Sequence, residues 1–313
     1  MGDKLIAIAW AGAALGPLVA WWAWRLLHRR PRLRIAALVL FAVVYVLGVW
    51  AFLAEPQVLV VRHVAIESPT WSGPPLRIGI LSDTHAGAPH VTPARVARTV
   101  ARLSAERPEI IVFLGDYAGS HEPAAVRAQA ERSTILRGVA ALGRAHAPLG
   151  RVAVLGNHDW WYDGPAIETA LRRAGITVLE NDAVRVARPG GAFWIAGLAD
   201  LDSQRTEPSA KTALAAVPPG EPVVLLTHWP DAWPLVPPRV ALTLAGHTHC
   251  GQVDLPILGR LVHASRASAR WACGRYDKGG RILYVTGGLG TSILPVRFRA
   301  PPEIVIVTLS GRP

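Results

Sequence analysis

Five short apolar runs in this chain are each followed directly by a polar motif, and this pairing constrains the fold more than any other feature. The runs have the length and composition of buried strands, and they span residues 76–81, 110–114, 152–155, 222–226 and 240–244. The motifs that follow are Asp83-Thr84-His85, Gly115-Asp116, Gly156-Asn157-His158-Asp159, Thr227-His228 and Gly246-His247-Thr248-His249. Side chains at strand ends can converge on one edge of a sheet, where open α/β sheets place their sites.

The remaining periodicity completes an α/β pattern. Helical spacing, with Thr92 as an N-cap for the first segment, predicts helices at 93–106, 122–142 and 166–174. Further strands are predicted at 176–179, 183–186 and 193–198. Strands that alternate with helices in the first half favour parallel β-α units, and the closely spaced later strands favour mixed pairing. We therefore expect one compact sandwich of two sheets with outer helices.

Two uncharged apolar runs of twenty residues, 5–24 and 35–54, precede these motifs. About twenty apolar residues cross a bilayer as a helix. The alternative is a hairpin buried in a soluble core, which is disfavoured because uncharged runs of this length are rare in soluble helices. We predict a two-helix membrane anchor at 1–54, a connector with a strand-like run (58–64) at 55–75, and a domain that carries the motifs at 76–313.

Basic residues gather between the two apolar runs. The loop there holds Arg25, Arg29, Arg30, Arg32 and Arg34. Lys4 is the one basic residue before the first run, and Arg62 is the first after the second. The positive-inside rule then puts the loop in the cytoplasm and everything after Ala54 outside. A twin-arginine-like export signal at Arg29-Arg30 is an alternative, and it leaves the domain on the same side.

The composition of residues 55–313 is mildly basic, with 27 Lys and Arg against 21 Asp and Glu. Such a surface favours anionic substrates or anionic lipid headgroups, although solubility alone also accounts for it. The two cysteines are Cys250 and Cys273. An extracytoplasmic location permits a disulfide between them but does not require one. Cys250 directly follows His249, so it can also lie beside a metal, or be a free apolar residue.

The motifs contain the residue types that bind divalent cations. Asp83 and His85 are two apart, so at a strand end their side chains point to the same side. Asp116 follows a glycine that allows a sharp turn, and its two oxygens can bridge two cations. His247 and His249 pair two imidazoles at the same spacing. Mixed oxygen and imidazole ligands suit Mn, Fe or Zn, and two such ions form a clamp for in-line phosphoryl displacement.

The third motif combines a ligand with acid–base groups. Asn157 offers a neutral amide oxygen to a metal. His158 can donate a proton to a leaving oxygen, and Asp159 can orient the His158 imidazole. His228 taken alone is more typical of a structural histidine, and it gains meaning from its place in the series.

The whole series resembles the calcineurin-like metallophosphoesterase superfamily over about residues 76–309. Segments near the carboxyl end are similar to its membrane-associated bacterial phosphodiesterase branch, namely 255–259, 274–276, 283–292 and 294–304. The resemblance implies a four-layer αββα sandwich and a centre of two divalent metal ions, Mn, Zn or Fe.

The resemblance also implies a role for each motif residue. It gives one metal to Asp83, His85 and His249, the other to Asn157, His228 and His247, and the bridge to Asp116. His158 is then the general acid, or a stabiliser of the phosphoryl oxygens. Two positions depart from the family's pattern, since many members carry an acidic residue in place of Gly119 and a glycine in place of Cys250.

These inferences favour a membrane-anchored phosphoesterase in which a hydroxide bridging two cations attacks phosphorus in line. The expected substrate is a phosphodiester from lipid or cell envelope, outside the cytoplasm, with membrane lipids as partners and no specific nucleic acid. His90 and His121 follow ligand motifs, so either can reach the substrate. One alternative is a hydrolase of UDP-sugar-lipid pyrophosphates, whose substrate usually faces the cytoplasm. Another is a catalytically silent metal-binding membrane scaffold.

Overall fold

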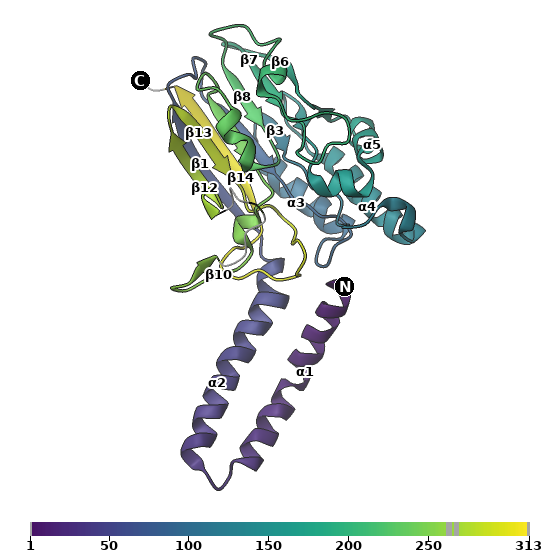
Figure 1. Cartoon of the computed structure of the whole chain (residues 1–313), viewed down its shortest axis with the longest axis vertical. Coiled ribbons are helices and arrows are strands. Elements are labelled where there is room, and N and C mark those ends of the chain that lie inside the picture. The colour runs from purple at the N-terminus through teal and green to yellow at the C-terminus, as the bar shows by residue number, and fades with distance from the viewer. Residues whose placement is uncertain (1, 261–264, 266–268, 312–313) are drawn as a thin grey trace.

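Two apolar helices form a hairpin that projects from the rest of the molecule in the computed structural model, which describes residues 2–260, 265 and 269–311 (Figure 1). They are α1 (Gly2–Leu26) and α2 (Pro31–Val49). Both are long and apolar enough to cross a membrane, and only 6% of each apolar window is buried by protein. A hairpin packed inside a soluble core is therefore excluded, because these side chains face outward.

The second helix continues into the domain through a change of helical type. A π-helical turn, η1 (Trp50–Ala54), is followed by a 3₁₀ turn, η2 (Glu55–Gln57). Pro56, five residues after Ala51, has no N–H to continue the π pattern. The Ala51 carbonyl instead accepts a hydrogen bond from the Arg297 backbone N–H at 3.0 Å. The second apolar helix thus ends against the loop that contains Arg297, near the carboxyl end of the chain.

The first sheet has six strands in the order β1-β14-β2-β3-β4-β5. The strands are β1 (Val60–Ser68), β14 (Glu303–Gly311), β2 (Leu76–Leu81), β3 (Ile110–Phe113), β4 (Arg151–Ala153) and β5 (Thr177–Val178). Only the β14–β2 pair is antiparallel among these described strands.

The second sheet has the order β12-β13-β9-β8-β7-β6. The strands are β12 (Gly274–Lys278), β13 (Arg281–Val285), β9 (Leu242–Ala245), β8 (Val223–Leu226), β7 (Gly191–Gly197) and β6 (Asp182–Arg188). The four inner strands are parallel, and both outer pairs are antiparallel. A small separate hairpin joins β10 (Asp254–Leu255) to β11 (Gly259–Arg260).

Helices cover the outer face of each sheet (Figure 1). The first sheet carries α3 (Pro93–Ala105), α4 (Gln129–Ala141) and α5 (Asn157–Arg173), and the second carries α6 (Ala210–Ala213) and the turn η5 (Pro230–Leu235). The other short turns are η3 (Ala124–Val126), η4 (Leu142–Arg144) and η6 (His249–Gly251).

The strands are apolar throughout because both of their faces are covered. Along β3, Ile110 and Val112 pack between the two sheets, whereas Ile111 and Phe113 pack against the helices. The same alternation separates Leu225 from its neighbours on β8. The predicted four-layer αββα sandwich, preceded by two apolar helices, is confirmed.

Two helices begin elsewhere than predicted. The helix expected at 122–142 begins at Gln129, because the extended backbone of Arg127 and Ala128 (ψ 145° and 146°) separates it from η3. The helix expected at 166–174 begins at Asn157, with a kink at Asp163 two residues before Pro165. The third motif is therefore the first turn of a helix.

The connector at 55–75 also contributes to the core. Its strand-like run lies in β1, which pairs in parallel with β14 from Val60↔Glu303 to Ser68↔Gly311. Local sequence cannot reveal a partner about 240 residues away. The boundaries after residues 54 and 75 stay predictions.

A disulfide joins Cys250 to Cys273 across a sequence separation of 23 residues. Closing a loop of this length removes unfolded-state entropy worth about 3 kcal/mol. We therefore expect Cys273→Ser to lower the denaturant midpoint of the purified protein. Reductant should have a similar effect on the wild type and little further effect on the variant. Two titratable thiols in the native, unreduced wild type would contradict the pairing.

Candidate metal centre

The five motifs meet at one edge of the molecule, because β2, β3, β4, β8 and β9 all end there. Their ionisable side chains form three overlapping groups, in each of which the potential ligand atoms lie within 4.8 Å of one another. The groups are Asp83, His85 and His249; His85, Asp116 and His158; and Asp116, His228 and His247. Every one of these side chains is buried.

The first ligand set predicted from the resemblance is brought together. His85 Nε2 lies 3.1 Å from His249 Nε2, and His249 Nε2 lies 3.5 Å from Asp83 Oδ1. Two imidazole nitrogens and one carboxylate oxygen therefore face a common point.

The second predicted set also converges. His247 Nδ1 lies 3.1 Å from the amide oxygen of Asn157 and 3.3 Å from His228 Nε2. His228 is oriented by its other nitrogen, since its Nδ1 lies 2.7 Å from the Leu114 carbonyl. A backbone contact of this kind fixes which ring nitrogen faces the site.

Asp116 lies between the two sets. Its Oδ2 is 3.6 Å from His85 Nε2 and 3.3 Å from His228 Nε2. One carboxylate facing an imidazole of each set is the arrangement that a bridging ligand needs. The donors, four imidazoles, two carboxylates and one amide, fit two borderline divalent cations.

The charges of these groups suit metal binding. Burial, together with neighbouring histidines, holds the pKa values of His85 and His249 well below the ordinary value. Burial opposes ionisation of Asp116, but His228 and His158 outweigh it and keep the pKa of that carboxyl well below its usual range. Burial also acts against the proton on His228, yet Asp116 raises the pKa of this ring to about 10. The neutral rings of His85 and His249 and the ionised bridge are metal-binding forms, whereas His228 would release its proton when it binds a cation.

Five of the seven ligands sit in the left-handed backbone region, which sequence reasoning did not anticipate. They are Asp83 (φ 51°), His85 (φ 44°), Asp116 (φ 54°), His247 (φ 68°) and His249 (φ 49°). This region costs a residue with a side chain about 1–3 kcal/mol, and such strain concentrates at functional sites. The left-handed turn comes just after each strand, where the side chain must turn toward the sheet edge.

Close packing explains why glycine occurs at two positions beside Asp116, namely Gly115 and Gly119. Gly115 has φ +96°, and a Cβ there would lie 2.7 Å from His228 Nδ1. At Gly119, a Cβ would lie 2.4 Å from the carbonyl oxygen of His85. The backbone at Gly119 thus excludes the acidic residue that many members of the family carry there.

Cys250, the other departure from the family's pattern, occupies a glycine-like conformation with φ 53°. Cys250 directly follows the ligand His249 in the sequence, and its disulfide to Cys273 restrains the backbone at that point. The covalent bond keeps the chain in a turn that a glycine would adopt without strain.

His158 lies beside the ligands and faces the cavity. Its Nε2 is 4.0 Å from Asp116 Oδ2 and 3.4 Å from the Ser292 hydroxyl. Its Nδ1 lies 3.0 Å from the Ser120 carbonyl. This contact orients the ring so that Nε2 faces the region where substrate would bind.

Asp159 has partners other than the predicted one. The sequence predicts that it orients the His158 ring, which instead contacts Ser120. The Asp159 carboxylate accepts hydrogen bonds from the backbone N–H groups of Tyr117 (2.8 Å), Ala118 (3.0 Å) and Gly156 (2.9 Å). Asp159 therefore ties the loop after Asp116 to the start of α5, because a helix N-terminus and adjacent amides attract a carboxylate.

Arg297 is a buried residue of the site that sequence reasoning missed. Its guanidinium donates to the carbonyls of Gly287 (2.7 Å), Gly290 (3.0 Å) and Ala300 (2.8 Å). One nitrogen lies 3.3 Å from His249 Nδ1. Burial lowers the pKa of Arg297 to about 10. The residue fixes the loop after β13 behind the ligand His249.

A cavity of about 300 Å³ opens over the ligands. Its polar wall includes Asp116, Asn157, His158, His247 and His249. Trp161, Trp229, Val253, Ile293, Leu294 and Val296 form its apolar wall. Trp229 stacks on His247 at a centroid distance of 3.6 Å, which helps to hold that ligand in place.

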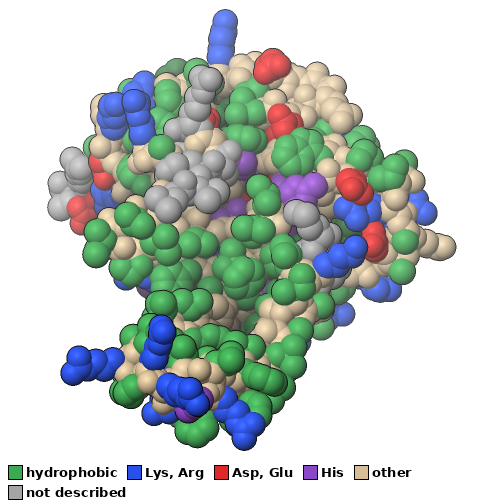
Figure 2. Space-filling view, turned by 60° about the horizontal axis from the view of Figure 1, so that its bottom comes forward, with side chains coloured by type: hydrophobic (Ala, Val, Ile, Leu, Met, Phe, Trp, Pro, Cys, Tyr) green, Lys and Arg blue, Asp and Glu red, His purple; other side chains and the backbone are tan. Residues whose placement is uncertain are grey.

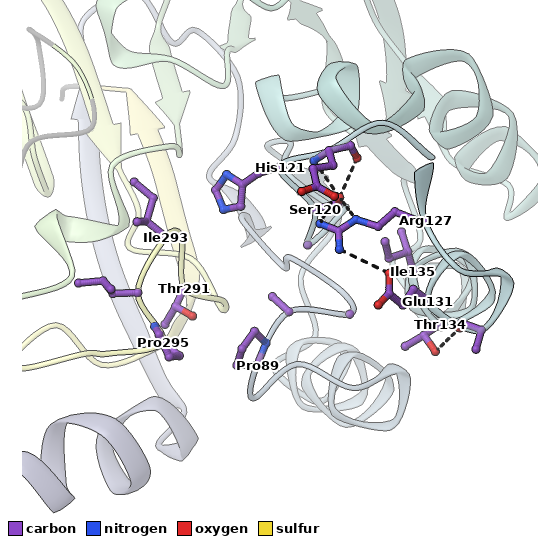
Figure 3. A pocket seen from close by; sticks show the side chains of 16 residues that line it. Pro89, Ser120, His121, Arg127, Glu131, Thr134, Ile135, Thr291, Ile293 and Pro295 are labelled. Atoms are coloured by element: carbon purple, nitrogen blue, oxygen red, sulfur yellow. Dashed lines mark hydrogen bonds and ion pairs between the residues drawn. The ribbon is translucent and has the colours of Figure 1, made fainter. Parts of the chain in front are cut away.

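A larger groove of about 540 Å³ adjoins this cavity. Figure 3 shows it between the 291–295 loop and the side that carries Ser120, Arg127 and Ile135. His121, Ile293 and Leu294 line both spaces. His121 thus lines both spaces, and its contact with a substrate stays a prediction. His90 lines neither of these two spaces and contacts Gln57 at 2.8 Å instead.

Comparison with known proteins agrees with this geometry. Residues 76–251 match the family described as calcineurin-like phosphoesterase. A "Transmembrane protein with metallophosphoesterase domain" from Danio rerio is 30% identical over 89% of this chain and 63% of its own length. Phosphodiesterase YaeI of Escherichia coli is 28% identical over 75% of this chain and 82% of its own length.

A third relative has a named lipid-related activity. It is the UDP-2,3-diacylglucosamine pyrophosphatase LpxG of Chlamydia trachomatis, 25% identical over 83% of this chain and 92% of its own length. The family match covers more than half of the chain and includes all seven candidate ligands. The chain therefore belongs to the calcineurin-like phosphoesterase family, and it is a metal-dependent phosphoester hydrolase with two apolar helices at its N-terminus.

Proposed function

We propose that this protein is a membrane-anchored phosphodiesterase that acts on a lipid or cell-envelope phosphodiester outside the cytoplasm, with two ions from among Mn, Zn and Fe. The observation that carries the hydrolytic part is Asp116 Oδ2, 3.6 Å from His85 and 3.3 Å from His228. A buried carboxylate shared by two ligand sets fits a dinuclear centre. The relative named as a phosphodiesterase supports the diester preference.

The bound ions would supply an activated water and neutralise charge on the phosphoryl oxygens. Asp83, His85 and His249 would hold one ion, Asn157, His228 and His247 the other, and Asp116 both. His158 donates a proton from Nε2 to the leaving oxygen, and its contact with the Ser120 carbonyl holds the ring in that orientation. With a substrate bound, the apolar wall around Trp161 and Val253 would displace water from the cavity and so strengthen these electrostatic contacts.

Two features support a location outside the cytoplasm. The arginine-rich turn between the helices lies at the end of the hairpin far from the domain (Figure 1). By the positive-inside rule that end is cytoplasmic, and the domain is on the other side. The disulfide between Cys250 and Cys273 fits an oxidising compartment.

A second candidate is hydrolysis of a UDP-sugar-lipid pyrophosphate. The relative named as a UDP-2,3-diacylglucosamine pyrophosphatase favours it. That substrate usually faces the cytoplasm, so the proposed orientation counts against it. A silent metal-binding scaffold has less support, because Asp116, Asn157 and His158 are all in place at the cavity.

We expect Asp116→Asn and His228→Ala each to abolish hydrolysis while the protein stays folded. Asn would replace the bridging charge with a neutral amide, and His228→Ala would remove a ligand. The measurement is turnover of a panel of lipid and nucleotide phosphodiesters, together with metal per chain by elemental analysis and a circular dichroism spectrum. Near-normal turnover with both metals retained would contradict the assignment of the site.

We expect His158→Ala to keep both metals but lose about 10²–10⁴-fold in rate, the usual contribution of a general acid. The loss should shrink for nitrophenyl esters, because a good leaving group needs little protonation. His146→Ala is a matched control, since His146 is exposed and lies outside the cavity lining described here. An equal loss for good and poor leaving groups would argue against proton donation.

The topology predicts that a reporter fused after Pro313 lies outside the cytoplasm, because basic loops resist translocation. A periplasmic-type reporter that needs oxidation should be active there, and a cytoplasm-dependent reporter inactive. A fusion within the arginine turn at residues 27–30 should show the reverse pattern. Activity of the cytoplasmic reporter after Pro313 would instead favour the pyrophosphatase alternative.

A further inference from the structure

Four large aliphatic side chains are exposed on two loops beside the end of α2. Ile257 and Leu258, at the tip of the β10–β11 hairpin, are 105% and 65% exposed. Ile293 and Leu294, in the loop after β13, are 66% and 43% exposed. We call these four residues the apolar rim. Aliphatic surface of this kind is unfavourable in water.

The two loops of the rim form one connected surface. The Gln252 side chain donates to the Ser292 carbonyl at 3.0 Å and accepts from the Ser292 backbone N–H at 2.5 Å. The backbone N–H groups of Asp254 and Phe298 donate to the carbonyls of Phe298 (2.9 Å) and Gln252 (2.8 Å). The hairpin and the 291–298 loop are therefore held together.

The same surface is tied to the second apolar helix. The Arg297 backbone N–H donates to the Ala51 carbonyl, in the last turn of the apolar run 35–54. Nearby, the Glu55 carboxylate accepts from the Ala300 backbone N–H at 2.8 Å and from Trp50 Nε1 at 2.6 Å. An indole at the end of a span is typical of the membrane–water interface.

These hydrogen bonds fix the position of the apolar rim relative to the end of the apolar run of α2. A run of about twenty apolar residues just spans the hydrocarbon, so Ala51 lies at its boundary when the helix crosses a membrane. Ile293 and Leu294 lie four and three residues, respectively, from Arg297, which contacts Ala51. Figure 2 shows hydrophobic side chains gathered between the helical hairpin and the hollow in which histidines are visible.

The rim also borders the catalytic cavity. Ile293 and Leu294 line it together with Val253 and Val296, and the hydroxyl of the preceding Ser292 lies 3.4 Å from His158 Nε2. The cavity thus combines aliphatic side chains from the loop that is tied to α2 with the side chains of the metal ligands. A molecule with an apolar chain next to a phosphate matches both walls.

We propose that the apolar rim lies in the surface of the bilayer, and that the substrate is a phosphodiester of an amphiphile whose acyl chains stay in the membrane. The phosphate enters the cavity past Ile293 and Leu294, while the chains remain beside α2. The phosphodiester chemistry rests on the proposed function. The membrane contact of the rim rests on its own hydrogen bonds and exposure.

The first test measures membrane contact without activity. Full-length Ile257→Cys is labelled with an environment-sensitive nitrobenzoxadiazole group under non-reducing conditions, because both native cysteines are paired. It is reconstituted in phosphatidylcholine–phosphatidylglycerol vesicles that contain doxyl-labelled lipid. We expect a blue-shifted emission that the doxyl lipid quenches.

The matched control is Leu235→Cys. Leu235 is 60% exposed. The carbonyl of the next residue, Val236, accepts a hydrogen bond from Arg281 at the start of β13. Leu235 therefore lies at the end of the sheet that is away from the ligands. A label there should show little quenching. Quenching at 257 no stronger than at 235 would overturn the membrane contact.

The second test uses a double variant, Ile257→Asp with Leu258→Asp. Neither Ile257 nor Leu258 lines the cavity that contains the metal ligands. The substitution removes apolar surface from the bilayer, and anionic headgroups repel the added carboxylates. We expect hydrolysis of phosphodiester lipids in vesicles to fall by about tenfold or more. Hydrolysis of soluble bis(p-nitrophenyl) phosphate should stay within about twofold. Leu235→Asp should leave both unchanged.

The outcomes separate this proposal from the proposed function. An equal loss on both substrates, or no loss on vesicles, would overturn the role of the rim. Quenching at 257 without turnover of any vesicle lipid by the wild type would overturn the amphiphilic substrate. A wild type that hydrolyses neither soluble nor vesicle phosphodiesters would contradict the proposed function itself, whatever the labels show.

Discussion

The site depends on one buried carboxylate. Asp116 has its side chain among His85, His228 and His158, and these rings keep it ionised despite its burial. Its Oδ1 also accepts from the His158 backbone N–H at 2.9 Å, which ties the start of α5 to the bridge. A buried charge without compensation would be strongly destabilising. Imidazoles that follow strands of both sheets, His85 and His228, accordingly meet at Asp116.

Four further ligands reach that point because their backbone adopts the strained left-handed conformation. Asp83, His85, His247 and His249 all take left-handed conformations directly after strands. Support comes from outside the motifs, where Asp159 binds the amides around Asp116 and Arg297 binds the loop behind His249. Such support allows strained residues to persist. The same Arg297 contributes its backbone N–H to Ala51, so the site and the apolar helix share one connection.

This connection gives the anchor a geometrical consequence. A flexible tether would only raise the local concentration of the domain at a membrane, whereas hydrogen bonds at Ala51 and Glu55 fix the cavity relative to the helix. The carbonyl at Ala51 is available because Pro56 cannot donate to it. The hydrogen bond from Arg297 to the Ala51 carbonyl thus places the loop that contains Arg297 next to the end of the second apolar helix.

Strand periodicity and ligand chemistry are local properties, so the apolar runs, the order of the five motifs and the residue types at the centre could all be predicted from the sequence. The strand-end positions predicted a common edge, but the assignment of His85 and His249, 164 residues apart, to one metal rested on the family resemblance. Three features became visible only in the folded chain: Asp159 binds backbone amides, Cys250 is paired, and Arg297 supports the site. The tertiary structure also placed β1 beside β14 and the apolar rim beside α2. Each of these depends on contacts between distant segments, which local pattern does not encode.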